Sequence, residues 1–175
     1  DAWGDAGGEH GSDAYKAVMY GLYSQFSTAA FAARKAIEDQ ASAVGAVPKD
    51  FHTTLITALA RPLASGAWFI AAFSVGDGAA ALIGAPEGSP CLLTRPDGGD
   101  FAGQTVFLTM KEALATGEAI MSRIRCAIVP RFDALVLVTD GVSDPRFESD
   151  TALADPAAWK RLWAETAPLV TAATT

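Results

Sequence analysis

The sequence predicts an α+β protein in which an antiparallel β-sandwich is flanked by helices, in the order helix, sheet, sheet, helix. Three observations predict this fold. Two segments with helical periodicity lie near the two ends of the chain. Between them, short segments rich in β-branched and aromatic residues follow one another, separated by Gly and Pro turns, which favours antiparallel pairing. Several of these segments are apolar throughout, so both of their faces must be covered.

Two helices are predicted from the spacing of apolar residues. The first covers residues 13–44, where Ser12 or Asp13 can cap the start and Gly45 can end the helix. The second begins at Pro156, a residue that fits the first turn of a helix. The predicted apolar faces are Val18, Leu22, Phe26, Ala29, Ala30, Ala33 and Ile37 in the first helix, and Trp159, Leu162, Trp163 and Thr166 in the second.

A series of strands is expected between the two helices. Each strand is a short apolar segment bounded by turn residues such as Pro62, Gly66 and Gly76. Residues 111–122 have a mixed pattern that predicts one helical turn and a loop. The predicted strands lie in residues 51–61, 68–78, 80–89, 90–95, 105–109, 124–130 and 133–141.

The composition is that of one folded domain, residues 1–175. Half of the residues are apolar and 19% are charged, which supports a buried core and excludes a disordered chain. The net charge of −7 disfavours a nucleic-acid partner, because nucleic-acid binders normally carry a basic face. Clustered carboxylates on such a chain would instead attract divalent cations.

Cysteine usage and the chain ends suggest where the protein acts. Cys91 and Cys126 are far apart and lack metal-ligand spacing, so two thiols in a reducing compartment are favoured, with one disulfide as the alternative. The chain has no apolar run of 18 residues and no signal peptide, so we expect a cytoplasmic location and no membrane partner. Because it starts at Asp1 rather than at methionine, we expect a piece of a longer gene product, truncated at both ends.

Two acids follow the apolar run in "DALVLVTDGVSD". Asp140 stands where the predicted strand ends, and Gly141 permits a sharp turn there. If a helical turn follows, Asp140 and Asp144 project the same way, and a divalent ion with oxygen ligands would relieve their repulsion. The alternative is that Asp140 caps a helix and that Asp144 is a solvated turn residue.

Two further clusters combine acids with glycine. Asp77 stands between two glycines in "WFIAAFSVGDG", inside what reads as an apolar hairpin, and the alternative interpretation is an ordinary β-turn. The chain opens with "DAWGDAGG", where carboxylates and carbonyl groups could approach one ion, because glycine lets the backbone come close. The alternative there is a flexible terminus.

Taken in order, these segments resemble the PPM family, the metal-dependent PP2C-type serine/threonine protein phosphatases, and look most like its compact bacterial branch. The resemblance covers about residues 1–147 and rests on the acid–glycine opening, the long helix, "FHTTLITAL", "VGDG" and "LVTDGVSD". It implies a β-sandwich between helices, in agreement with the pattern above. It also implies hydrolysis of phosphoserine and phosphothreonine on proteins, usually in opposition to a Ser/Thr kinase.

The resemblance implies an active site with two Mn²⁺ or Mg²⁺ ions bridged by a water or hydroxide, with a third ion in some members. Asp1 matches the bridging aspartate, and Ala2 stands at the glycine whose carbonyl group reaches one ion. Asp140 matches the metal-binding aspartate of the TDG motif. Asp77 and Asp144 resemble the pair that holds a third, weaker ion in bacterial members.

Three departures from the family pattern bear on function. Ala2 replaces a glycine, and the family's phosphate-contacting arginine lies upstream of the motif at which this chain starts. The family's late aspartate motif is not found after residue 147, because Asp150 and Asp155 have the wrong context. An inactive piece is therefore one expected outcome. The alternative function is a non-catalytic PP2C-like module that binds a phosphoprotein or regulates a partner.

Other residues and a third interpretation complete the expectations. His10 could act as a general acid for the leaving alkoxide, although a surface role is favoured. His52 is expected to be structural, and the tryptophans, including Trp3, are expected mostly to anchor packing. In an unrelated α/β domain, GDG and TDG would be plain turns, and Asp77, Asp140 and the chain start would lie far apart.

Overall fold

The long helix α1, Asp13–Ala43, confirms the first predicted helix. In this computed structural model, which describes residues 12–94, 105–147 and 149–173, the Ser12 hydroxyl accepts a hydrogen bond from the amide of Tyr15 at 3.1 Å. Ser12 rather than Asp13 is therefore the N-cap. The chain leaves the helix through Gly45, as predicted.

The strands form two antiparallel sheets. The first sheet has the order β1-β2-β4, with β1 at Leu55–Pro62, β2 at Trp68–Val75 and β4 at Ile124–Val129. The second sheet pairs β3, Ala79–Ile83, with β5, Ala134–Val138. The remaining elements are 3₁₀ turns at Pro48–Phe51 and Lys111–Leu114, α2 at Gly117–Met121, α3 at Asp140–Arg146, α4 at Asp150–Leu153 and α5 at Pro156–Ala173.

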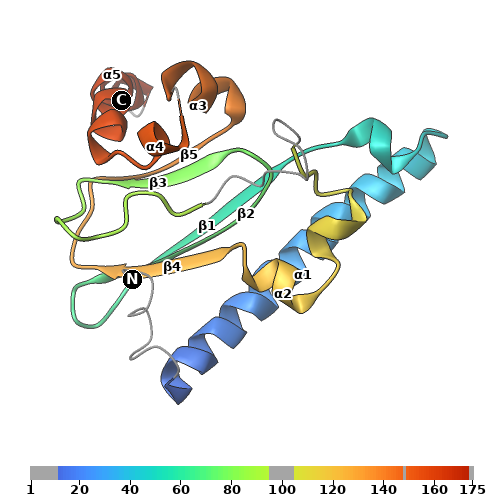
Figure 1. Ribbon diagram of the computed structural model, residues 1–175, viewed down its shortest axis with the longest axis horizontal. Coiled ribbons are helices and arrows are strands. Elements are labelled where there is room, and N and C mark those ends of the chain that lie inside the picture. The colour runs from blue at the N-terminus through green and yellow to red at the C-terminus, as the bar shows by residue number, and fades with distance from the viewer. Residues whose placement is uncertain (1–11, 95–104, 148, 174–175) are drawn as a thin grey trace.

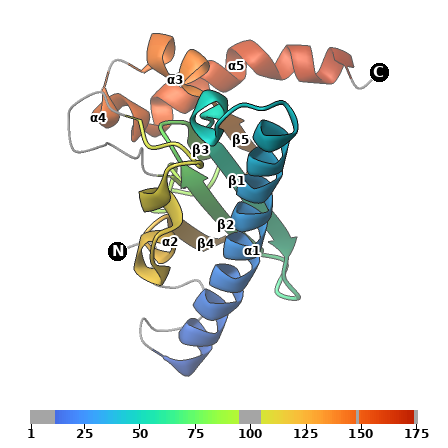
Figure 2. The ribbon, with the colours of Figure 1, turned by 90° about the vertical axis from the view of Figure 1, so that its right-hand side faces the viewer.

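Side chains of the central strands pack on both faces, which explains why these strands are apolar throughout. Phe73 of β2 stacks against Phe26 of α1, with ring centroids 5.8 Å apart. The neighbouring Ala72 belongs to a different core cluster, which it shares with Leu82 of β3. The other face of β3 packs with α5. Figures 1 and 2 show α1 and α2 on one side of the sheets and α5 on the other. The α+β class is thus confirmed.

The helix α5 confirms the second predicted helix, and Trp159 anchors it. The Trp159 side chain is fully buried, donates a hydrogen bond from Nε1 to the Leu153 carbonyl at 2.7 Å, and lies 4.5 Å from the ring of Phe147. Trp68 packs edge-on against Phe132 on the other side of the second sheet. No helix within the described ranges is long and apolar enough to cross a membrane.

Two of the predicted strands are wrong. Apart from a single bridge residue, Thr105, residues 105–109 are not in a strand, because the chain turns there and buries Leu108 in the core beside α1. In the described part of residues 90–95, Leu92 makes only an isolated bridge to Ala81. The apolar side chains of both segments are buried or half-buried although the backbone forms a loop. The local sequence pattern does not distinguish such a loop from a buried strand.

Cys91 and Cys126 are free thiols, as favoured from the sequence. Burial raises the pKa of each thiol from 9.0 to about 11, and the charge of Asp155 adds to the effect at Cys91. We therefore expect slow alkylation of the folded chain by iodoacetamide near pH 8, with a rate that rises with pH towards 11, since only the thiolate reacts.

Mass spectrometry after timed labelling at several pH values checks this, with the denatured chain as the control. The folded state holds these two protons more tightly than the unfolded state does. The contribution of both thiols to the free energy of unfolding is therefore complete below pH 9 and is lost as the pH rises towards 11. Labelling of Cys91 at the same rate in folded and denatured chains at pH 8 would contradict the burial argument.

Candidate metal centre

Asp77 and Asp140 lie at the same end of the second sheet. In the antiparallel pairing of β3 with β5, Ala79 is opposite Val138. Asp77 comes two residues before Ala79, and Asp140 comes two residues after Val138. Because the start of one antiparallel strand lies beside the end of its partner, both acids lie at the same end of this strand pair. The alternative of an unrelated α/β domain placed Asp77 and Asp140 far apart, and for these two residues that placement is wrong.

Asp77 lies on a crossing between the two sheets and not in a hairpin. Its flanking strands belong to different sheets, since β2 pairs with β1 and β4, whereas β3 pairs with β5. The expected hairpin is therefore wrong: β2 and β3 lie in different sheets, and their side chains cover one another's apolar faces in a shared core cluster. The crossing is tight: a Cβ on Gly76 would lie 2.3 Å from Cγ2 of Thr54, and one on Gly78 would lie 2.8 Å from the Val138 carbonyl oxygen.

The carboxylate of Asp77 is fixed by a tertiary contact. Thr105 donates a hydrogen bond from Oγ1 to Oδ2 of Asp77 at 2.6 Å, and both residues are half-buried. The sequence analysis missed Thr105, which fell in a segment that was predicted to be a strand. No local signal could have found it, because the two residues are 28 positions apart and meet only through the fold.

Asp140 and Asp144 lie on α3, which begins directly after β5. The N-cap of α3 is Thr139, and Asp140 is the first helical residue, so the interpretation of Asp140 as the cap is wrong. Its Oδ1 accepts a hydrogen bond from the amide of Gly141 at 2.7 Å. Asp144 follows four positions later on the same side of the helix, and both acids are exposed to solvent.

Other predicted site residues lie outside the described part of the chain. These are Asp1, Ala2 and His10, together with Trp3. Within residues 12–94, 105–147 and 149–173, no group of three or more His, Cys, Asp and Glu side chains is close enough to hold one metal ion. The carboxylates that the second sheet brings to one end are hard oxygen donors, which is the chemistry that Mn²⁺ and Mg²⁺ require.

His52 has the contacts of a structural residue. Its Nδ1 lies 2.5 Å from Oγ1 of Thr109, and its ring stacks on Phe107 with centroids 4.7 Å apart. These contacts join the approach to β1 with the segment that follows Thr105. These contacts agree with the structural role predicted for His52.

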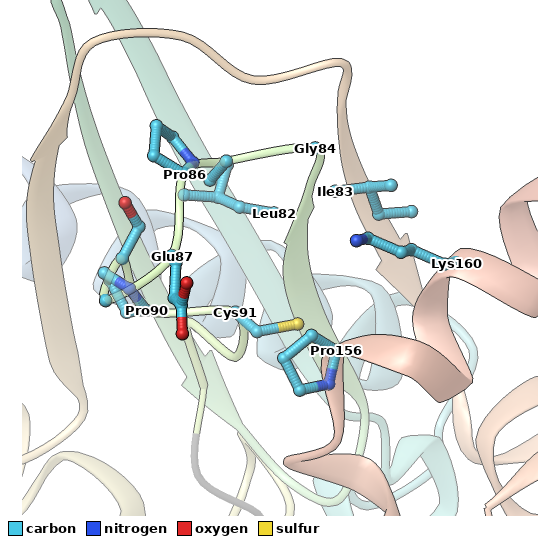
Figure 3. Close-up of a pocket in the computed structure, with 12 residues that line it drawn as sticks. Leu82, Ile83, Gly84, Pro86, Glu87, Pro90, Cys91, Pro156 and Lys160 are labelled. Atoms are coloured by element: carbon cyan, nitrogen blue, oxygen red, sulfur yellow. The ribbon is translucent and has the colours of Figure 1, made fainter.

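A cavity of about 330 Å³ lies at the far end of β3, away from Asp77. Its wall is formed by the loop that follows β3 and by the start of α5, and Figure 3 shows Glu87 and Pro90 on the loop side and Pro156 and Lys160 on the α5 side. The amide of Ala157 in the first turn of α5 is already bonded to the Asp155 carboxylate at 2.9 Å. Because the cavity lies at the far end of β3, it is separate from the end of the second sheet where Asp77 and Asp140 lie, which we call the acidic end.

These features define a class of protein: an α+β chain whose second antiparallel sheet brings two carboxylates, those of Asp77 and Asp140, to one end. Comparison with known families then identifies the family, because the model of protein phosphatase 2C matches residues 9–174. The chain belongs to the protein phosphatase 2C family, as its motifs predicted. Searches of curated proteins and of solved structures found no match.

The family match extends past the limit expected from the motifs. The resemblance was expected to cover about residues 1–147, whereas the match covers residues 9–174 and so continues through α4 and α5. Membership of this family points to phosphatase activity, which is a hydrolase reaction, and its members generally depend on Mn²⁺ or Mg²⁺.

Proposed function

We propose that the chain is a metal-dependent protein serine/threonine phosphatase, which hydrolyses phosphoserine and phosphothreonine with Mn²⁺ or Mg²⁺. The observation that carries this proposal is the pairing of β3 with β5, which puts Asp77 and Asp140 at one end of a sheet in a protein phosphatase 2C chain. Carboxylates gathered there from distant segments repel one another, and a divalent cation relieves that repulsion.

The residues divide into two sets of ligands. Asp140, Asp1 and the carbonyl group of Ala2 would hold the two catalytic ions, and Asp77 and Asp144 would hold a third, weaker ion. Bound ions supply charge that neutralises the phosphoryl oxygens and makes a water nucleophile available at neutral pH. Asp140 and Asp144 are exposed, so a phosphorylated segment of a protein could approach them without prior unfolding.

The fold and the partners are part of the proposal. We propose that the domain is a helix–sheet–sheet–helix sandwich, which is supported by the core cluster that β2 and β3 share. Its substrate is a phosphorylated protein, and its action opposes a Ser/Thr kinase in the cytoplasm. The free thiols agree with a reducing compartment.

Phosphate release from phosphopeptides tests the function. The full chain is incubated with a phosphoserine or phosphothreonine peptide in Mn²⁺, after chelation, and after Mn²⁺ is restored. We expect release about tenfold faster or more with Mn²⁺ than after chelation, because a poor alkoxide leaving group needs the charge of the metals. The unphosphorylated peptide is the control for background phosphate.

The same experiment separates the proposed enzyme from a binding module. The alanine at position 2, where the resemblance has a glycine, favours weak catalysis. Retention of the phosphopeptide without phosphate release would favour the non-catalytic module over the enzyme. Absence of release, of peptide binding and of Mn²⁺ binding by calorimetry would contradict both.

A further inference from the structure

Thr105 and Asp77 form a charge-assisted hydrogen bond at the acidic end of the second sheet. The Oγ1–Oδ2 distance of 2.6 Å is short, as is typical when a hydroxyl group donates to an ionised carboxylate. Both residues are half-buried, so water competes with this bond less than at an open surface. Among the residues that the structure describes, side-chain hydrogen bonds reach Asp77 only at Oδ2, so Oδ1 is left for another ligand.

The segment that carries Thr105 is itself fastened to the core. The amide of Leu108 donates a hydrogen bond to the Thr53 carbonyl at 2.9 Å, and the Leu108 side chain is buried beside α1. Thr109 is joined to His52 by a contact of 2.5 Å. The hydroxyl of Thr105 therefore projects from a segment with a defined position rather than from a free surface loop.

The backbone on both sides of Asp77 is equally constrained. Gly76 lies against Thr54 and, at 3.4 Å from its Cβ position, against the carbonyl oxygen of Val106. Gly78 lies against the carbonyl oxygen of Val138 in β5. With the backbone fixed, the main freedom left to Asp77 is rotation of its side chain, and the bond from Thr105 restricts that rotation.

We infer that Thr105 is a positioning residue for the proposed metal site: its hydroxyl holds Oδ2 of Asp77 so that Oδ1 faces the ion. This inference rests on the proposed function, because it assumes that Asp77 is a metal ligand. Protein groups that orient a metal ligand commonly affect metal affinity by about 10–100-fold. Thr105 acts through Asp77 and does not itself contact substrate.

Mn²⁺ binding to the full chain tests the inference without any need for turnover. The probe is Mn²⁺ alone, and the free ion is measured by electron paramagnetic resonance during a titration. Thr105→Val keeps the shape of the side chain and removes the hydroxyl, so we expect the weakest class of Mn²⁺ sites to lose about tenfold in affinity. Thr105→Ser restores the hydroxyl and is expected to restore most of the affinity.

Thr57→Val is the matched control. Oγ1 of Thr57 is buried in β1 and has no hydrogen-bond partner within the described residues, so the same substitution there should leave Mn²⁺ affinity unchanged. Asp77→Asn is the second comparison and is expected to abolish the weakest class of sites. In that background Thr105→Val should have no further effect, because the two changes act on one carboxylate.

The outcomes distinguish the inference from the proposed function. If Asp77→Asn weakens Mn²⁺ binding while Thr105→Val leaves it unchanged or tightens it, the positioning role is wrong and the metal assignment stands. If Asp77→Asn has no effect on Mn²⁺ binding, Asp77 is not a metal ligand, and both its assignment to the third ion and the positioning role of Thr105 are wrong. Circular dichroism establishes that each variant is folded, and Thr105→Ala repeats the test should Thr105→Val unfold.

Discussion

Substitution of Asp140 by Asn is expected to lower kcat/KM for Mn²⁺-dependent phosphoester hydrolysis by about a hundredfold or more, since about 3 kcal/mol of charge stabilisation corresponds to that factor. The amide is nearly the same size as the carboxylate but carries no charge for a divalent ion. Its oxygen can still accept the hydrogen bond from Gly141, and the position is exposed, so stability should change little. Initial rates over a range of Mn²⁺ concentrations measure the effect.

Asp133→Asn provides the control for this substitution. Asp133 is also an exposed acid next to β5, but it precedes the strand, whereas Asp140 follows it. The same change of charge at Asp133 should therefore leave the rate and the Mn²⁺ requirement as they are. Equal losses in both variants would point to a general effect of charge and would remove Asp140 from the metal site.

The two acids of the opening segment allow a further comparison. Asp1 is the proposed bridging ligand, and Asp5 belongs to the same acid–glycine cluster. Loss of Mn²⁺-dependent activity in Asp5→Asn, with activity retained in Asp1→Asn, would move the bridging role to Asp5 and leave the metal chemistry of the family intact.

Replacement of Gly76 by Ala is expected to destabilise the chain by about 3 kcal/mol, roughly 2 from steric overlap and 1 from the left-handed backbone. Its φ is 106°, and the added Cβ would lie 2.3 Å from Cγ2 and 2.6 Å from Cβ of Thr54. The Cβ of Thr54 moves only with its backbone, so the crossing from β2 to β3 would have to shift. A fall in Tm of roughly 10 °C is expected for a chain of this size.

Gly88→Ala separates the two contributions. Gly88 also has a positive φ, 85°, but an added Cβ there would meet no atom within 4 Å. Its substitution should therefore cost only the backbone term, about 1 kcal/mol. Thermal unfolding of both variants, followed by circular dichroism, measures the difference. A loss in Gly76→Ala no greater than that in Gly88→Ala would show that the crossing tolerates a side chain.

The arrangement of strands shows where local pattern stops being informative. The apolar segments at β1, β2, β3, β4 and β5 were all expected as strands, because β-branched and aromatic residues between turns are a local signal. Their partners were not expected: β3 pairs with β5, across a long intervening stretch of chain, instead of with β2. Residues 105–109 carry the same local signal, yet they form a buried loop.

The sequence by itself determined the long helix, the terminal helix with its buried Trp159, the segments that form β1 to β5 and the family, because periodicity and motif order are properties of neighbouring residues. Only the tertiary structure decided that Asp77 and Asp140 share one end of a sheet and that Thr105 holds the Asp77 carboxylate. The physical reason is that strand pairing follows from which faces need cover, and that depends on the whole core rather than on adjacent residues.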